Sequence, residues 1–293
     1  MSAGAVPDYL RDFRDVWEEF HLSDVTPVRG GDVARSFRAQ TPDGAVFIKV
    51  LPDPVPGMFE HEALGLRALR EHVPASLNVP RVLSSSRRGL VLEWVDEGER
   101  GSAATEEEFG RGLAGLHGSS NEFFGGVGGD ARGVLGTVDL DERPCDRWSE
   151  FFAERRLVPL TEQAVAAGRL DPRARGLVER LAQRADELCG AVEPPALLHG
   201  DLWAGNRLVD VNGRNWLVDP AVFWGHREYD VAMMMLFGGF GSRAFAAYEE
   251  VAPLADGWKS RVRWYQLPPL LVHTIMFGGS YGNEALAAMG AYL

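Results

Sequence analysis

The sequence predicts an α+β protein with two lobes: a small β-rich lobe over residues 1–95 and a larger, mostly helical lobe over residues 96–293. Three observations predict this class. Short β-prone runs broken by turn residues fill the first third of the chain, helical periodicity dominates the rest, and one β-rich insert over 197–225 interrupts the helices. The polar stretch 96–102 separates the two parts as a linker would, and we expect the functional site in the cleft between the lobes.

The small lobe should begin with a helix, because Leu10, Phe13 and Trp17 recur at helical spacing. Short β-prone runs separated by glycines and a turn at 42–44 then predict strands, and an apolar-periodic stretch that ends before Pro74 predicts a helix. In order, we expect strands over 25–28, 36–40 and 45–51, a helix over 57–71, and strands over 80–86 and 89–95.

Helices account for most of the larger lobe. Thr105 and Glu108 have the spacing of a capping box, so we expect a helix that begins at Thr105 and runs to about residue 116. Further helices are predicted over 147–167 and 172–189. Within the insert, the Asn212-Gly213 pair lies between two apolar runs and predicts a β-hairpin.

Composition excludes several classes of function. With 293 residues and 45% hydrophobic content, the chain can form two lobes with substantial cores. Its formal net charge of -12, from 30 basic and 42 acidic residues, argues against a surface for binding phosphate backbones, so nucleic acid is not an expected partner.

The chain shows no sign of export or membrane insertion. Residues 1–13 lack the basic and apolar regions of a secretory signal, and the apolar stretch 231–240 is about half the ~20 residues of a membrane-spanning helix. Cys145 and Cys189 do not form a CxxC pair. We therefore expect a cytoplasmic protein, with residues 231–240 in a buried helix.

The strongest chemical signal is the segment HGDLWAGN over 199–206, followed by an aspartate at the end of the next strand of the hairpin. Transfer of a phosphoryl group from ATP needs a carboxylate that orients the attacking hydroxyl and oxygen ligands for Mg²⁺. Asp201 suits the first role, and Asn206 with Asp219 suits the second, because the hairpin folds their segments together. Each alone could be a turn or strand-end residue, but their joint order and spacing are specific.

Three segments resemble the bacterial fructosamine kinases, or ketosamine kinases: HGDLWAGN, VDPAVFWGHREYDVAM over 218–233 and LFGGF over 236–240. This family lies within the group that also holds aminoglycoside and choline kinases, and the resemblance covers nearly the whole chain. It implies a protein-kinase-like fold and phosphorylation, with ATP and Mg²⁺, of a sugar hydroxyl on fructosamine or ribulosamine adducts, a deglycation repair. An aminoglycoside or choline kinase and a pseudokinase without turnover are the alternatives.

Lys49 lies inside the apolar strand VFIKVL, where an unpaired ammonium group would be costly. In kinase-like folds a helix glutamate pairs with this lysine, which holds the α and β phosphates. Glu62 occupies that position, and Glu60, two residues away, would point to another face of the helix. The alternative is a lysine that extends to solvent from an edge strand.

Two further segments are assigned to nucleotide binding by the resemblance. The paired glycines Gly30 and Gly31 would cover the phosphates with their backbone amides, although such a pair by itself is more often a turn. The end of the last strand of the small lobe would hold adenine through backbone groups. Without the resemblance, this segment would be interpreted only as the end of a strand. Its residues are Leu92, Glu93, Trp94 and Val95.

Polar and aromatic residues around the catalytic segment complete the predicted site. In the family, Asp230 is structural and bonds backbone amides of the catalytic loop. Trp203, Trp224 and His226 could form an aromatic platform for a sugar, or could equally belong to the core.

The acceptor should be a small molecule or a small adduct on a side chain. Gly200 stands where regulated protein kinases usually place an arginine that pairs with a phosphorylated activation loop. Only ten residues separate Asp219 from Asp230, which leaves no room for an activation segment that could support a peptide. After Ser260 the only acidic residue is Glu284, which argues mildly against a polycationic acceptor such as an aminoglycoside.

Overall fold

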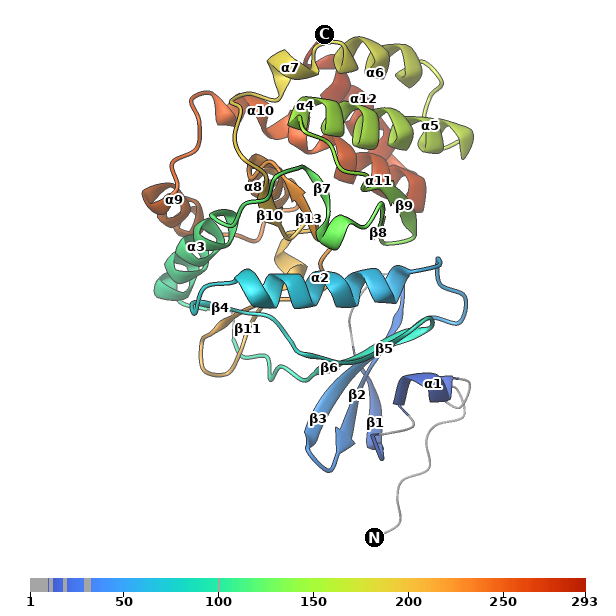
Figure 1. Cartoon of the computed structure of the whole chain (residues 1–293), viewed down its shortest axis with the longest axis vertical. Helices are drawn as coiled ribbons and strands as arrows, with labels where there is room; N and C mark the ends of the chain where they lie inside the picture. Colours follow the sequence, from blue (N-terminus) through green and yellow to red (C-terminus); the bar gives the residue numbers. More distant parts are fainter. Residues whose placement is uncertain (1–9, 11–12, 18–19, 29–32, 100) are drawn as a thin grey trace.

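The computed structural model describes residues 10, 13–17, 20–28, 33–99 and 101–293. A β-sheet lobe and a larger helical lobe are arranged along the long axis of the molecule, with helix α2 between them (Figure 1). The predicted α+β, two-lobed class is therefore confirmed. Of the predicted opening helix, α1 (Arg14–Trp17) is described, whereas Gly30 and Gly31 lie outside the described residues.

The small lobe contains a five-stranded antiparallel sheet with the order β1-β2-β3-β6-β5. All five strands agree with the predicted β-prone runs: β1 Ser23–Val28, β2 Arg35–Thr41, β3 Gly44–Val50, β5 Val82–Ser86 and β6 Gly89–Glu93. Alternation along β3 places Val46, Ile48 and Val50 in the core beneath α1. Phe47 and Lys49 consequently face the other side of the sheet, where α2 lies.

Helix α2 (Met58–His72) packs against both lobes. Its Phe59, Leu66 and Leu69 share one continuous core with Leu92 of the sheet and with residues of the helical lobe. That core extends through Phe109, Leu113, Leu197, Leu202, Leu217, Val222, Trp224 and Met234. The short strand β4 (Leu77–Asn78) also pairs in parallel with β12 (Asn215–Leu217), so the lobes are joined by backbone hydrogen bonds as well as by packing.

The insert in the helical lobe forms the predicted hairpin. Strands β11 (Arg207–Val209) and β12 pair antiparallel. Asp210 stabilises their turn, since its Oδ1 accepts hydrogen bonds from the amides of Asn212 and Arg214 at 2.9 and 3.0 Å. Outside the hairpin, β10 (Ala196–Leu198) pairs with β13 (Phe223–Gly225), which also pairs with β7 (Gly125–Gly126). These pairings bring the two ends of the insert together.

Helices form the rest of this lobe, in the order α3 Ala103–His117, α4 Trp148–Glu150, a π-helical segment Phe151–Leu157, α5 Val158–Ala166, α6 Ala174–Ala182, α7 Ala185–Leu188, α8 Glu228–Leu236, α9 Ser242–Val251, α10 Trp258–Tyr265, α11 Leu267–Phe277 and α12 Ser280–Gly290. Strands β8 (Arg132–Leu135) and β9 (Val138–Asp141) form a second hairpin that the sequence did not indicate.

Several predicted boundaries were wrong. The N-cap of α3 is Ser102, whose hydroxyl accepts from the Thr105 amide, so the capping box assigned to Thr105 lies one turn too late. The predicted helix 172–189 is two helices, and the predicted helix 231–240 ends at Leu236, because Gly238 and Gly239 adopt positive φ. Within the described ranges, no helix combines the length and apolarity needed to cross a bilayer.

Candidate active site

The segment 199–206 forms a tight loop that depends on glycine at its second position. Gly200 has φ of 81°, and a Cβ there would overlap the carbonyl oxygen of Ala221. The amide of Ala221 in turn donates to the carbonyl of His199 at 2.9 Å. Glycine therefore allows the catalytic loop and the segment after Asp219 to lie in direct contact, and the arginine of regulated protein kinases could not adopt this geometry without strain.

Asp201, Asn206 and Asp219 converge on one point, as the hairpin predicted. The Asn206 side-chain amide donates to Oδ2 of Asp201 at 2.9 Å, to the Asp201 carbonyl at 2.8 Å and to the Asp219 carbonyl at 3.3 Å. Asp219 itself has φ of 55°, a left-handed conformation that is uncommon for a residue other than glycine. The loop and the end of the hairpin are thus joined through one amide group.

Lys49 connects this cluster to the small lobe. Its Nζ donates to Glu62 of α2 at 2.9 Å and also to Oδ1 of Asp219. Glu62, and not the exposed Glu60, is therefore the helix partner. Burial disfavours the charge on Lys49, but the carboxylates of Asp219 and Glu62 outweigh burial and raise the pKa of the lysine. The lysine remains charged although only 7% of its side chain is exposed.

The carboxyl group of Asp201 titrates near neutrality. Burial, followed by the negative charge of Asp219, raises the pKa of Asp201 to about 7, against an ordinary value of 3.8. His199, next to it in the loop, is held neutral, because burial lowers the pKa of its ring. Its Nδ1 accepts from the Asp201 amide at 3.3 Å, so its Nε2 carries the hydrogen and donates to the Val218 carbonyl at 3.1 Å.

Asp230 supports the loop from the first turn of α8. Its two carboxylate oxygens accept from the amides of His199 and Gly200 at 2.7 and 3.0 Å, and the whole residue is buried. His117 of α3 lies 3.2 Å from the same carboxylate and 2.8 Å from the Tyr248 hydroxyl. The loop 199–206 is therefore fixed from behind by α3, α8 and α9.

The residues at this point fit a divalent cation that also binds phosphate. Asn206 uses its amide nitrogen for three hydrogen bonds, and within the described part of the chain its Oδ1 accepts none. The Asp219 side chain is 36% exposed. In the described ranges no three His, Cys, Asp or Glu side chains form a metal-binding group. A cation held by Asn206 and Asp219 would therefore need further oxygen ligands, which nucleotide phosphates supply.

A family model described as fructosamine kinase matches residues 13–293. The chain belongs to the fructosamine kinase family. It is 35% identical to a "Probable ketoamine kinase" of Enterococcus faecium over 93% of this chain and 97% of that one. It is 30% identical to the chloroplastic protein-ribulosamine 3-kinase of Arabidopsis thaliana, with 93% and 83% covered.

Solved structures agree with this membership. The crystal structure of a candidate fructosamine-3-kinase from Thermobifida fusca has 36% sequence identity and a TM-score of 0.86, and each chain covers 98% of the other. A thermostable mutant of an aminoglycoside phosphotransferase, solved with AMP-PNP and hygromycin B, has 18% identity, a TM-score of 0.59 and 94% coverage of both chains. This second likeness shows the protein-kinase-like fold alone.

In this member of the fructosamine kinase family, the four residues predicted to hold adenine divide into two groups. The first group makes contacts within the small lobe: Leu92 is buried in the core, and Glu93 pairs with Arg81 at 2.6 Å. Trp94 and Val95 follow the last residue of β6. The indole of Trp94 is fixed by two contacts, because it donates to Asp96 at 2.8 Å and lies under the Arg38 guanidinium.

The structure separates the three predicted acceptor residues. Trp203 is 37% exposed, whereas Trp224 and His226 are buried in the core. Trp224 packs edge-on against His72 of α2, and the ring of His226 contacts the rings of Trp148 and Tyr265, which also contact each other. For Trp224 and His226 the structure supports the alternative of core packing, because their side chains present no free face to a sugar.

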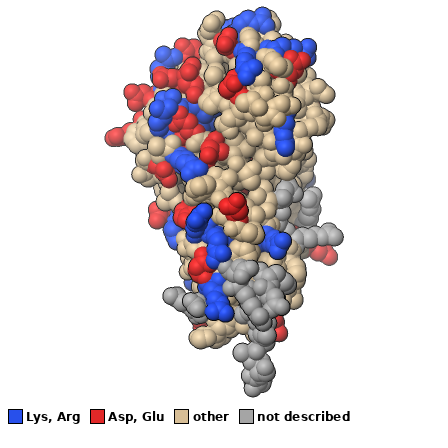
Figure 2. All heavy atoms as spheres, turned by 90° about the vertical axis from the view of Figure 1, so that its right-hand side faces the viewer, with Lys and Arg blue, Asp and Glu red and all other residues tan. Residues whose placement is uncertain are grey.

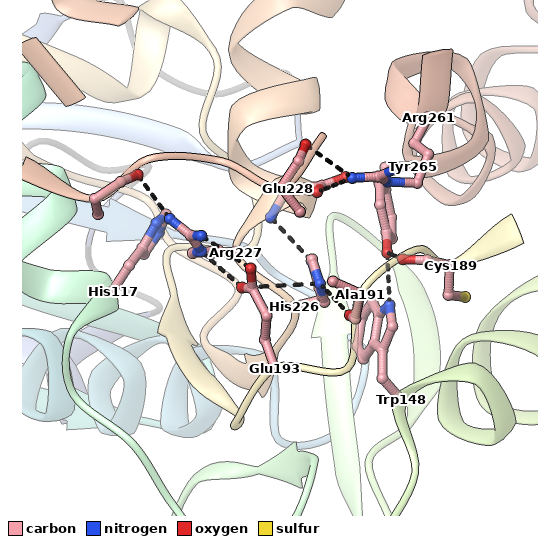
Figure 3. Close-up of polar contacts among 12 residues, drawn as sticks. His117, Trp148, Cys189, Ala191, Glu193, His226, Arg227, Glu228, Arg261 and Tyr265 are labelled. Carbon is pink, nitrogen blue, oxygen red and sulfur yellow. Dashed lines mark hydrogen bonds and ion pairs between the residues drawn. The ribbon is translucent and has the colours of Figure 1, made fainter. Parts of the chain in front are cut away.

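His226 is part of a buried polar network behind the site (Figure 3). Its Nε2 donates to the Ala191 carbonyl at 3.2 Å, and its Nδ1 accepts from the Glu228 amide at 3.3 Å. On either side, Arg227 pairs with Glu193 at 2.6 Å and Arg261 pairs with Glu228 at 2.6 Å. The GHRE segment that carries the family resemblance therefore joins α8 to the helices around it.

Sequence reasoning missed His117 and Tyr248, which orient Asp230. They lie 113 and 18 residues from it in the chain, on α3 and α9, and no local pattern connects them. A buried pair of Arg156 and Glu142, 2.5 Å apart, was also missed. The guanidinium of the arginine contacts the rings of both Phe151 and Phe223, which stack on each other. Only a map of spatial contacts could have found these groups.

Proposed function

We propose that this protein is an ATP- and Mg²⁺-dependent kinase that phosphorylates a sugar hydroxyl of ketosamines, with deglycation as its task. One observation carries the proposal: Lys49, Asp201, Asn206 and Asp219 meet at one point between the lobes. Membership of the fructosamine kinase family and the names of its ketoamine and ribulosamine kinase relatives support the ketosamine as acceptor.

Each of these residues has a role in the proposed reaction. Asp201 accepts the proton of the attacking hydroxyl, while the γ-phosphoryl group leaves the ADP oxygen and bonds to the sugar oxygen. Lys49, fixed by Glu62, binds the α and β phosphates. Asn206 and Asp219 would hold Mg²⁺, which offsets phosphate charge when bound. Asp230 orients the loop that carries Asp201.

The segment between Asp219 and Asp230 supports a small acceptor. Its residues form β13, which pairs on one side with β10 and on the other with β7. In this arrangement the chain passes directly from β13 into α8. Both edges of β13 are paired with other strands, so neither edge is available to an extended peptide. A ketosamine, either free or at the end of a lysine side chain, fits this constraint.

Finer assignments belong to the same proposal. The small lobe, residues 1–95, would bind the nucleotide with backbone groups at Trp94 and Val95, and with Gly30 and Gly31, while residues 96–293 would hold the acceptor. A cytoplasmic location and the absence of nucleic acid partners also remain predictions. On the face shown in Figure 2, basic and acidic side chains are interspersed, which supports the second of these.

A phosphate-transfer screen tests the proposal. Purified protein with Mg-ATP is offered fructoselysine, ribuloselysine, free sugars, choline and aminoglycosides, and products are identified by mass. We expect phosphorylation of one or both ketosamines and no transfer by Asp201→Ala. Transfer only to choline or an antibiotic contradicts the assignment. ATP binding without transfer to any acceptor supports the pseudokinase alternative instead.

A further inference from the structure

A surface cavity of about 410 Å³ lies in the helical lobe, and it shares no residue with the site at Asp201. Strands β8 and β9 form one wall of this cavity, hereafter the hairpin cavity. The π-helical segment Phe151–Leu157 and the first half of α5 form the other wall. The hairpin also contacts α2 through β8 (Figure 1). The volume is in the range of small-molecule sites, roughly 300 to 1,000 Å³.

The charged residues that line the hairpin cavity carry an excess of positive charge. Three of them are arginines, Arg132, Arg143 and Arg155, and two are aspartates, Asp139 and Asp141. Three positive charges against two negative charges leave an excess of one positive charge. The chain as a whole has a net charge of -12. A local positive excess on so acidic a chain favours an anionic ligand.

Two of the three arginines are matched by the two aspartates. Nε of Arg132 donates to Oδ1 of Asp139 at 2.9 Å. Arg143 contacts both carboxylate oxygens of Asp141, since its Nε lies 2.9 and 3.1 Å from them and its Nη2 lies 2.6 Å from Oδ2. Such a two-point contact is the strongest pairing that an arginine and a carboxylate form. The excess positive charge in the hairpin cavity is therefore that of Arg155.

The guanidinium group of Arg155 has unused hydrogen-bond donors. Its Nε is buried and finds no acceptor among the residues that the structure describes. Oδ2 of Asp141 lies 3.6 Å from that nitrogen, which is too far for a hydrogen bond. The side chain is 23% exposed, so solvent reaches only part of it. A planar fork of five donors with a net charge matches the oxygens of a phosphate group.

The local sequence explains why Arg155 lines the cavity while Arg156 does not. Pro159 has no amide hydrogen, so the carbonyl of Arg155 loses its usual helical donor. Nη1 of Arg156 donates to that carbonyl at 3.2 Å and to the Asp141 carbonyl at 2.7 Å. Nη2 of Arg156 lies 2.5 Å from Glu142. Arg156 is thereby held inside the protein, and only Arg155 is left for the cavity.

The rest of the lining suits a compact ligand with hydroxyl groups. Leu140 and Leu160 are buried and give the cavity an apolar base. The side-chain amide of Gln163 forms no hydrogen bond within the described ranges of the chain, so it can both donate to and accept from a hydroxyl. Asp139 is 56% exposed and can accept a further hydrogen bond. A sugar combines hydroxyl groups with apolar C–H faces.

We propose that the hairpin cavity binds a small phosphorylated sugar, with its phosphate group at Arg155 and its hydroxyl groups at Gln163 and Asp139. This is a second ligand site, separate from Asp201, and it does not depend on the proposed kinase reaction.

Calorimetric titration tests the proposal. The protein is kept with an excess of Mg-AMP-PNP, so that the nucleotide site is occupied, and is titrated with glucose 6-phosphate, inorganic phosphate and glucose. We expect glucose 6-phosphate to bind, inorganic phosphate to bind several-fold more weakly and glucose to show no binding. Arg155→Gln should weaken binding of glucose 6-phosphate at least ~10-fold, because a charged hydrogen-bond donor is lost. Arg243→Gln is the matched control, since this exposed arginine pairs with Glu107 away from the cavity.

A second variant should act in the opposite direction. Asp141→Asn removes a negative charge beside Arg155 and should tighten binding of glucose 6-phosphate about threefold or more. This arm also keeps the test valid if Arg155→Gln fails to fold. Glucose 6-phosphate that does not bind, or that binds equally to the wild type and both variants, would overturn the proposal. Equal affinity for inorganic phosphate would overturn the assignment of Gln163 and Asp139 to a sugar.

Discussion

At the scale of single residues, the proposed role of Asp201 as the base makes activity depend on the protonation of its carboxyl group. A base with a pKa of about 7 is protonated in acid and cannot accept a proton there. We therefore expect kcat/KM for a ketosamine to fall about tenfold per pH unit below pH ~7 and to be level above it. The measurement is a pH profile of initial rates at fixed Mg-ATP.

Asp201→Asn provides the comparison for this profile. An amide cannot accept the proton, so kcat should fall by about 10² to 10⁴ while KM for ATP changes little. The residual activity should lose its dependence on pH near 7. A residual profile identical to that of the wild type would show that another group is the base.

The raised pKa of Asp201 also predicts how the stability of the protein depends on pH. The folded-state pKa of Asp201 lies above the ordinary value of 3.8, so ionisation of this group destabilises the native state. The destabilisation is absent below pH ~4, grows between pH ~4 and ~7 and is complete above. Asp201→Asn should therefore raise Tm at pH 8 and have little effect at pH 4. A lower Tm at pH 8 would contradict the assigned direction of the shift.

Gly200 tests the geometry of the loop. Gly200→Ala adds a Cβ that overlaps the Ala221 carbonyl oxygen at a φ of 81°, so we expect a loss of more than ~3 kcal/mol in the free energy of unfolding. Gly213→Ala is the matched control. Its φ is 78°, but no atom lies within 4 Å of the added Cβ, so only the conformational cost of about 1 kcal/mol applies. Urea unfolding measures both, and equal losses would refute the close contact.

At the scale of elements, Lys49 forms two ion pairs, one that fixes strand β3 to Glu62 of α2 and one that fixes it to Asp219 at the end of the hairpin. Lys49→Met leaves the Glu62 and Asp219 carboxylates without their cation, so we expect a loss of about 3 to 5 kcal/mol in stability and a large loss of kcat. Lys49→Met with Glu62→Leu should recover part of the stability and none of the activity. Thermal unfolding and phosphate-transfer rates separate the two effects.

Recovery of activity in this double variant would contradict the proposed role of Lys49. Failure to recover stability would instead mean that Asp219, and not Glu62, is the main source of the destabilisation. The two outcomes concern different contacts of the same ammonium group.

A second contact between elements brings α2 close to the segment after the hairpin. A Cβ on Gly65 would lie 2.9 Å from Cγ2 of Val222. Gly65→Ala should therefore cost about 1 to 3 kcal/mol, although alanine favours a helix. Adding Val222→Ala should remove much of that cost. A double-mutant cycle measures the coupling, and strictly additive losses would contradict the contact.

At the scale of the whole molecule, the lobes share one core. Phe59 and Leu66 from the small lobe pack with Leu197 and Val222 from the large one, and β4 pairs with β12. The boundary predicted at residue 95 marks the change from β-prone runs to helical periodicity in the sequence. Residues 1–95 alone, however, would expose the apolar face of α2. The chain should therefore unfold as one cooperative unit.

The polar residues of the candidate site lie close together in the sequence. The apolar alternation that predicts each strand also extends over only a few residues. HGDLWAGN, the hairpin turn and the aspartate after it lie within 21 residues, from His199 to Asp219, so their spacing determines their convergence. The alternation in VFIKVL likewise places Lys49 and Ile48 on opposite faces of the sheet. These features could be predicted because each depends on backbone geometry over a few residues.

The sequence by itself determined the two-lobed class, the convergence of Asp201, Asn206 and Asp219, and the pairing of Lys49 with Glu62. Only the tertiary structure decided that Trp224 and His226 are buried while Trp203 is exposed, because burial depends on what distant elements place beside a side chain. The same holds for His117 behind Asp230. These two residues come from segments far apart in the chain, and contacts of that kind leave no periodic signal in the sequence.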